Sequence, residues 1–507
     1  MKKSNTGSFL AALLCTLLST GGIAAQCNVA PSLQASDADW QGWGNGYANT
    51  RHVPNGIAST DLENLRLRWA FGFEGTGSVV GNPVVHGNTL FIGVDSGVVH
   101  ALDADTGCVY WTFKADSGVR TAPAYGVVQN EPRLFFGDNN AQLYSVDART
   151  GAQHWKVEVE AHPSARLTGS PQFFRIDNEA IPDRLMLPVS SGEEGIAAVP
   201  TYNCCTFRGS VVSLDAASGE IIWQSYTINT PAEATGENTS GPSGGAIWSA
   251  PTLDLANRLM YVTTGDAYSA PADKGTDALI AMNLLSGEHL WISQGTPDDI
   301  WTVVCMTPRA TEECGPDQDY GSPAMLVPQE DGTTLLAGQK SGIVRAFDQQ
   351  SGEVERATAL VENTTEFGGK IIWGGASDGT RAYFGLGSGG IAGVDVATGN
   401  IDWFTPIEPS AERSRNIGHD GPLTVSSDLV LSGGWDGMFR ILAVSTGELL
   451  WQFDTVRTFE TVNGVEAKGG SMGAAGPIVS GKRLFVPTGY VGVKSGMQGN
   501  ALLMFSP

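Results

Sequence analysis

Acidic side chains in and around three long loops are the residues of this sequence best placed to do chemistry. The chain of 507 residues carries a formal net charge of −23, and its loop carboxylates include Glu193, Glu194, Asp266, Asp298 and Asp299. Hard oxygen ligands that come from separate loops are typical of a Ca²⁺ site. Ordinary solvated acidic loops are the alternative, and composition alone favours that alternative.

Two adjacent cysteines, Cys204 and Cys205, stand in the loop over residues 188–209. Neighbouring sulfurs do not easily serve one metal ion, so the compartment decides whether they are thiols or disulfide-bonded. The first 25 residues have the layout of a secretory signal peptide, with two lysines, an apolar run too short to span a membrane, and small residues before Gln26. We therefore expect a signal peptide over residues 1–25 and a periplasmic location.

Removing that leader leaves six cysteines, and an even number in an oxidising compartment predicts three disulfides. The acidic balance, without basic runs, disfavours nucleic acid as a partner. No later apolar segment is long enough to span a bilayer. The sequence also lacks zinc-protease, nucleophile-elbow and phosphate-loop motifs, and it has no CxxCH motif for covalent c-type haem.

A recurring pattern organises the rest of the chain. Each copy has alternating apolar residues, a Thr-Gly or Ser-Gly turn and a second strand that usually carries Trp, which predicts a β-hairpin. Another hairpin precedes most copies, so the unit is four short antiparallel strands. Repeats of this size predict a β-propeller. The repeat-type tryptophans are Trp111, Trp155, Trp223, Trp291, Trp403 and Trp451.

The two ends of the chain complete an eighth blade. Residues 476–506 supply three strands without a Trp strand, whereas residues 65–71, which include Trp69, form a Trp strand without its preceding hairpin. Pairing these ends closes the ring and removes exposed sheet edges. We therefore predict an all-β, single-domain, eight-bladed propeller over residues 26–507, with an open solenoid as the alternative.

Long loops are concentrated in the third to fifth repeats. The interval between repeat tryptophans is 42 residues from Trp69 to Trp111 but 68 residues from Trp155 to Trp223. Long loops on a rigid scaffold commonly carry function, so we expect the site there. The loops cover residues 188–209, 226–248 and 296–321.

Several motifs together resemble the pyrroloquinoline-quinone (PQQ) dependent alcohol dehydrogenases, and most closely the polyvinyl alcohol dehydrogenase subgroup, without a haem c domain. They are the DAxTGxxxW repeat, 194-EGIAAVPTYNCCTFRG, 244-GGAIWSAPTLD, 259-LMYVTTGDAYS, 296-TPDDIW and 338-GQKSG. The resemblance extends over essentially the whole chain after the leader. It implies oxidation of alcohols, with secondary alcohols or polyvinyl alcohol as the expected substrates.

The resemblance implies that PQQ lies flat between a disulfide of Cys204 with Cys205 and the face of Trp248. A planar quinone gains from an aromatic floor. Separate disulfides for the two cysteines and core packing of Trp248 are the alternatives. The PQQ carboxylates are expected at Arg120, Thr168 and Ser191, and the quinone oxygens at Lys340, whose charge stabilises the electron-rich reduced cofactor. The cofactor-binding set is therefore Cys204, Cys205, Trp248, Arg120, Thr168, Ser191 and Lys340.

The same resemblance implies a Ca²⁺ ion held by Glu194, Asp266 and Asp299. Asp299 is the expected general base, because an alcohol is a poor hydride donor until its hydroxyl is deprotonated. Asp266 stands where the family often has Asn, so a trivalent lanthanide is an alternative to Ca²⁺. Glu193 competes with Glu194 for the ligand role, and Asp298 competes with Asp299.

Two further pairings and one partner complete the expectations. Cys305 and Cys314 bracket a short loop beside Asp299, so we expect them to pair, and Cys27 with Cys108 as the third disulfide. Electrons are expected to pass to a separate, basic cytochrome c, favoured by the acidic chain. A non-catalytic propeller scaffold of the outer-membrane assembly type is the alternative, as is a propeller lactonase or hydrolase.

Overall fold

The computed structural model describes Met1, Arg413 and residues 26–176, 181–330, 332–362, 370–408, 418–492 and 496–507. The expected signal peptide, residues 1–25, lies outside the described residues apart from Met1. Three short helices accompany the strands, and among the described residues no helix is long and apolar enough to cross a membrane. They are η1 (Ser59–Asn64), α1 (Glu193–Ile196) and η2 (Val303–Met306).

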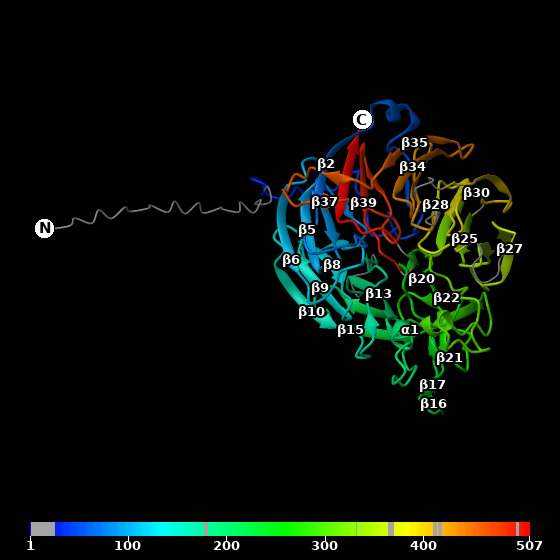
Figure 1. Ribbon diagram of the computed structural model, residues 1–507. Coiled ribbons are helices and arrows are strands. Elements are labelled where there is room, and N and C mark those ends of the chain that lie inside the picture. The colour runs from blue at the N-terminus through cyan, green and yellow to red at the C-terminus, as the bar shows by residue number, and fades with distance from the viewer. Residues whose placement is uncertain are drawn as a thin grey trace.

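Eight antiparallel four-stranded blades form a ring, as predicted (Figure 1). Blade 1 consists of β3 (Val84–His86), β4 (Thr89–Gly93), β5 (Val98–Asp103) and β6 (Val109–Lys114). Blade 2 consists of β7 (Ala124–Val128), β8 (Glu131–Gly137), β9 (Gln142–Asp147) and β10 (Gln153–Glu158). Blade 3 consists of β12 (Gln172–Phe174), β13 (Arg184–Ser191), β14 (Ser210–Asp215) and β15 (Ile221–Tyr226). Blade 4 consists of β19 (Thr252–Asp254), β20 (Leu259–Thr263), β22 (Ala278–Asn283) and β23 (His289–Gln294).

The second half of the ring repeats this plan. Blade 5 consists of β24 (Met325–Gln329), β25 (Gly332–Gly338), β26 (Ile343–Phe347) and β27 (Val354–Ala359). Blade 6 consists of β28 (Ala376–Ser377), β29 (Arg381–Gly385), β30 (Ile391–Asp395) and β31 (Ile401–Thr405). Blade 7 consists of β32 (Thr424–Ser426), β33 (Leu429–Gly433), β34 (Met438–Ala443) and β35 (Leu449–Asp454). Blade 8 consists of β38 (Ile478–Ser480), β39 (Arg483–Thr488), β40 (Ala501–Ser506) and β2 (Arg66–Gly72).

Blade 8 closes the ring with both ends of the chain, which confirms the prediction. The N-terminal strand β2 pairs with the C-terminal strand β40, with Trp69 opposite Met504 and Phe71 opposite Leu502. Figure 1 shows the two strands side by side. The described propeller therefore leaves no blade incomplete.

The repeated Asp, Thr-Gly and Trp residues lock each blade to the next. In blade 2, Asp147 Oδ1 accepts hydrogen bonds from the backbone of Arg149 and Thr150, which shapes the turn. Gly151 has a φ of 72°, and its face lies so close to Trp111 of blade 1 that a Cβ there would be 2.7 Å from the indole. The Trp111 Nε1 donates to the Ala148 carbonyl at 3.1 Å. The residues of the sequence repeat thus form the contact between neighbouring blades.

Short strands outside the blades complete the fold. Strand β1 (His52–Val53) runs parallel to β32 in blade 7, which the repeat pattern did not predict. Strand β11 (Ala165–Arg166) pairs with β13. The remaining pairs are β16 (Glu233–Gly236) with β17 (Thr239–Gly241), β18 (Ser243–Gly244) with β21 (Ala267–Ser269), and β36 (Thr458–Phe459) with β37 (Ala467–Lys468).

The N-terminal segment of residues 40–51 is hydrogen-bonded to the inner strands of several blades. Its backbone carbonyls accept hydrogen bonds from the inner strands of four successive blades, namely Leu253 N to Tyr47 O, Leu326 N to Ala48 O, Ser377 N to Thr50 O and Val425 N to Arg51 O. The buried Arg51 guanidinium lies between the rings of Trp40 and Trp43. Trp43 and Trp248 line one small cavity, so this segment supports the site from behind.

Candidate functional site

One cavity of about 690 Å³ lies where loops of blades 2 to 8 converge. Its walls are rich in aromatic rings that meet edge to face: Trp248 with Trp373 at 5.1 Å between ring centroids, Trp373 with Tyr490 at 6.1 Å, and Trp435 with Tyr490 at 5.4 Å. A cavity of this volume with aromatic walls suits a planar ligand. Of the residues proposed for the cofactor, Trp248, Arg120, Thr168, Ser191 and Lys340 line it.

Carboxylates and lysines meet on one part of the cavity wall. Glu194, Asp266, Asp317 and Asp319 all line the cavity. Lys340 Nζ lies 2.6 Å from an oxygen of Asp317 and 2.5 Å from an oxygen of Asp319. A second lysine, Lys370, pairs with the other oxygen of Asp317 at 2.7 Å. The two lysines therefore pair directly with Asp317 and Asp319, whereas among the described residues no salt bridge joins Glu194 or Asp266 to a basic side chain.

The pKa values of these groups depend on whether a lysine pairs with them directly. Burial raises the pKa of Glu194 to about 7, and burial together with Asp319 raises the pKa of Asp266 well above its ordinary value. Burial opposes ionisation of Asp317, but Lys340 and Lys370 outweigh it and hold the pKa of Asp317 below its ordinary value. Burial likewise disfavours the charged form of Lys340, yet the surrounding carboxylates raise the pKa of Lys340 well above its ordinary value. Lys340 and Asp317 are thus an ionised pair.

The donor atoms on this wall fit a hard cation. Oxygens of Asp266, Asp317 and Asp319 lie within 4.8 Å of one another. The buried Asp266 Oδ1 has no hydrogen-bond partner among the described residues. An all-carboxylate donor set suits Ca²⁺ or a similar oxygen-seeking ion. Glu194 lines the cavity within electrostatic range of Lys340 and Asp319 and can add a further ligand.

Positive and neutral donors line other parts of the cavity. The guanidinium of the half-buried Arg120 lies 4.4 Å from the centroid of Trp373. Arg166, which the sequence analysis did not single out, also lines the cavity. Thr168 Oγ1 is buried without a hydrogen-bond partner in the described structure. Two arginines and an unpartnered hydroxyl fit the carboxylates of an anionic cofactor such as PQQ.

All three expected disulfides are present, which confirms the pairing of Cys27 with Cys108, Cys204 with Cys205 and Cys305 with Cys314. Separate partners for the adjacent cysteines were the wrong alternative. Cys305 and Cys314 line the cavity directly.

The adjacent pair lies behind the cavity wall. Neither Cys204 nor Cys205 belongs to the lining residues, and Cys205 is fully buried. Both cysteines pack in an apolar cluster with Ala246 and Tyr268, which do line the cavity. Contact between this disulfide and a bound quinone therefore stays a prediction.

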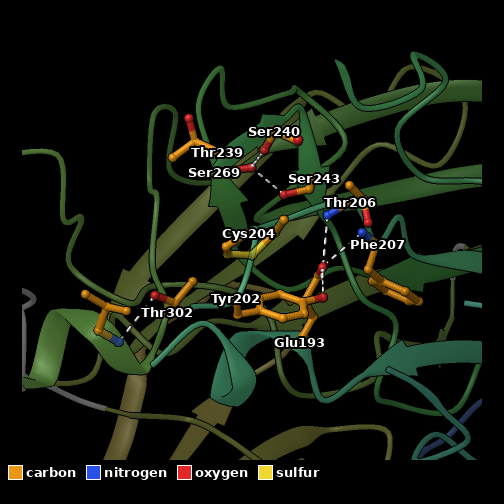
Figure 2. Close-up of a disulfide and its surroundings, with 12 residues drawn as sticks. Glu193, Tyr202, Cys204, Thr206, Phe207, Thr239, Ser240, Ser243, Ser269 and Thr302 are labelled. Atoms are coloured by element: carbon orange, nitrogen blue, oxygen red, sulfur yellow. Dashed lines mark hydrogen bonds between the residues drawn. A yellow bond between two sulfur atoms is a disulfide. The ribbon is translucent and has the colours of Figure 1, made fainter. Parts of the chain in front are cut away.

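The two glutamates that compete for the ligand role, Glu193 and Glu194, are neighbours in helix α1 but have different surroundings. Glu193 is fully buried and accepts hydrogen bonds from Tyr202 Oη at 2.6 Å, Thr206 N at 3.0 Å and Phe207 N at 2.8 Å. Figure 2 shows these bonds beside the Cys204 disulfide. Because Glu193 is used to hold the disulfide loop, its neighbour Glu194 is the glutamate that faces the cavity.

Asp299 is buried behind the lining residues and does not itself line the cavity. Its carboxylate accepts the backbone N–H of Asp317 at 3.3 Å and of Gln318 at 2.8 Å. Asp298, its competitor, is exposed. Asp299 thus positions the segment that carries the two cavity carboxylates Asp317 and Asp319.

Sequence reasoning missed Asp317, Asp319 and Lys370. The first two lie two residues apart in the long loop 296–321, and an Asp-x-Asp spacing inside a predicted functional loop was the available signal. Lys370 carried no motif, because its partner Asp317 is 53 residues away and lies close only in the fold.

Comparisons with known proteins point to one family. The family model of the PQQ-type glucose, ethanol and alcohol dehydrogenase β-propeller domain matches residues 40–307. A polyvinylalcohol dehydrogenase from Pseudomonas sp. is 35% identical, over 94% of this chain and 78% of that protein. A second one, from Sphingopyxis sp. (strain 113P3), is 32% identical, over 95% of this chain and 79% of that protein.

Solved structures show the same fold at lower identity. A europium-containing methanol dehydrogenase has a TM-score of 0.69 and 18% identity, covering 94% of this chain and 99% of that chain. The quinohemoprotein alcohol dehydrogenase from Comamonas testosteroni has a TM-score of 0.67 and 17% identity, covering 92% of this chain and 80% of that chain. BamB from Moraxella catarrhalis has a TM-score of 0.52 and 14% identity, covering 87% of this chain and 98% of that chain.

Proposed function

Because this chain belongs to the PQQ-dependent dehydrogenases and is an alcohol dehydrogenase similar to polyvinyl alcohol dehydrogenases, we propose that its cavity oxidises secondary alcohols, including polyvinyl alcohol, with PQQ and Ca²⁺. The cavity carries this proposal, because aromatic walls, two arginines and uncompensated carboxylates meet in it. Carboxylates without a salt-bridge partner in a closed site lower the stability of the fold, and a non-catalytic scaffold would not require them. The likeness to BamB extends to the fold alone.

We assign the cofactor contacts from the lining residues. Trp248 offers an aromatic face, and its Nε1 is fixed by a hydrogen bond to Asp319 Oδ2 at 3.2 Å. Arg120, Arg166 and Thr168 would bind the carboxylates of PQQ, and Lys340 would stabilise negative charge on the quinone oxygens. Glu194 and Asp266 hold the cation. When bound, PQQ supplies the acceptor for the hydride that leaves the alcohol carbon, and Ca²⁺ supplies a Lewis acid beside it.

Asp317 is the group that we propose to accept the hydroxyl proton of the alcohol. Its carboxylate is ionised and 19% exposed, and it lines the cavity. A general base must first lie within reach of its proton, and only then does its pKa matter. Asp299, the base expected from the family resemblance, lies behind Asp317 and acts through the backbone that it holds.

Reconstitution with PQQ and Ca²⁺ tests the function. We expect PQQ binding at micromolar concentration and dye reduction with secondary alcohols and with polyvinyl alcohol. Absence of PQQ binding would refute the assignment of the cavity, whereas activity confined to small primary alcohols would refute only the substrate class. The same assay with lanthanide in place of Ca²⁺ identifies the ion that supports turnover.

Electrons leave, in this proposal, to a separate basic cytochrome c in the periplasm. The net charge of −23 favours a cationic partner, and three disulfides favour an oxidising compartment. We expect the rate of cytochrome reduction by the substrate-reduced enzyme to fall as ionic strength rises, because salt screens the attraction. A rate that is independent of salt in stopped-flow measurements would contradict an electrostatic encounter.

A further inference from the structure

A second group of carboxylates lies behind the cavity wall. Oxygens of Asp266, Asp277 and Asp299 lie within 4.8 Å of one another, and all three residues are buried. Asp266 belongs both to this group and to the group with Asp317 and Asp319. Asp277 and Asp299 do not line the cavity, so the second group is separate from the space that receives cofactor and substrate.

The carboxylate of Asp277 is buried and meets no basic side chain. Its exposed fraction is 0%, and among the described residues no hydrogen bond of good geometry reaches either carboxylate oxygen, although Thr276 and the Asp266 carboxylate lie beside it. Asp266 Oδ1 likewise has no bond of good geometry. A buried ionised carboxylate is costly without a counter-charge, so such a group binds a cation or a proton. The carboxylates of Asp266 and Asp277 lie close enough to share either one.

The backbone holds the three aspartates in a fixed frame. The backbone N–H of Asp277 donates to Gly265 O at 3.0 Å, next to Asp266, and Ala267 N donates to Asp299 O at 3.3 Å. Asp266 and Asp277 flank the connection between β20 and β22 of blade 4, whereas Asp299 comes from the long loop 296–321. A ligand bound to all three therefore joins that loop to blade 4.

Direct ion pairs reach only part of this set. Six carboxyl groups form the two groups together with Glu194, and the ammonium groups of Lys340 and Lys370 pair directly with Asp317 and Asp319. Among the described residues no salt bridge joins Glu194, Asp266, Asp277 or Asp299 to a basic side chain. A cation bound behind the wall would compensate carboxylates that the two lysines do not pair with.

We propose that Asp266, Asp277 and Asp299 bind a second hard divalent cation, of the Ca²⁺ class, behind the cavity wall. Oxygen ligands from three backbone segments suit Ca²⁺, which tolerates irregular geometry. This cation fixes the loop that carries Asp317 and Asp319, and it shares Asp266 with the cation of the cavity. The site is made of protein oxygens alone and does not depend on PQQ.

Metal counting on the purified chain tests the second site. The protein is saturated with CaCl₂ in the presence of PQQ, desalted, and analysed by inductively coupled plasma mass spectrometry. We expect two Ca²⁺ per chain in the wild type, one in Asp277→Asn, and two in the control Asp298→Asn, whose carboxylate is exposed. One Ca²⁺ in the wild type, or two in Asp277→Asn, would overturn the proposal, because protons would then hold the buried aspartates.

The result remains decisive if Asp277→Asn does not fold, because the wild-type count alone separates one cation from two. Failure of the second site is also distinct from failure of the proposed function. A chain with one Ca²⁺ and PQQ-dependent dehydrogenase activity refutes only the second cation. Two Ca²⁺ without dehydrogenase activity refute only the proposed function.

Discussion

Replacing Asp317 by Asn is expected to lower kcat for alcohol oxidation by about 10³-fold, the usual contribution of a positioned base. The substitution keeps the shape of the side chain and removes only its capacity to take the hydroxyl proton. PQQ binding should persist, because Arg120 and Trp248 are unchanged. Single-turnover reduction of bound PQQ, followed by absorbance, measures this step without product release.

Asp299→Asn is the matched comparison, because both substitutions remove one carboxylate from the same loop, Asp317 on the cavity wall and Asp299 behind it. Asp299 acts through the amides of Asp317 and Gln318, so its loss should lower kcat by only about 10-fold. The pH profile should keep its shape in Asp299→Asn and lose, in Asp317→Asn, its acidic limb, which is the fall in rate as the base becomes protonated. A larger loss of kcat in Asp299→Asn than in Asp317→Asn would return the role of base to Asp299.

Replacing Lys340 by Met is expected to lower the free energy of unfolding by about 3–5 kcal/mol in the metal-free, PQQ-free protein. Lys340 is the shared cation of the half-buried Asp317 and the buried Asp319, at 2.6 and 2.5 Å. Methionine keeps much of the side-chain volume but leaves those carboxylates with less compensation. Denaturant unfolding followed by tryptophan fluorescence measures the change.

Lys482→Met is the control for this prediction. Lys482 pairs with Asp61 at the same distance, 2.6 Å, but its side chain is 55% exposed. Exposed ion pairs contribute little because water screens them, so this control should change stability by less than about 1 kcal/mol. Equal losses of unfolding free energy in the two variants would show that the ion pairs of Lys340 stabilise the protein no more than an exposed ion pair does.

Local repeats made much of the fold predictable from sequence. The Asp, Thr-Gly and Trp positions recur at a spacing that stacked hairpins satisfy, and most of the repeat tryptophans pack on the turn glycine of the next blade, as Trp111 does on Gly151. The unmatched Trp69 strand likewise required a partner, which β40 supplies. The loop residues Glu194, Asp266, Trp248 and Lys340 were found because their motifs are local.

The sequence by itself determined the eight-bladed ring and the family, because these depend on local motifs and on the number of repeats, and the even number of cysteines after the leader indicated three disulfides. Only the tertiary structure decided which carboxylates face the cavity. Glu194 rather than Glu193 lines it, and Asp317 lies in front of Asp299, because neighbouring residues of one loop point to different sides. The contact of Lys370 with Asp317 joins separate blades, and such electrostatic partners are set by the closure of the ring rather than by spacing along the chain.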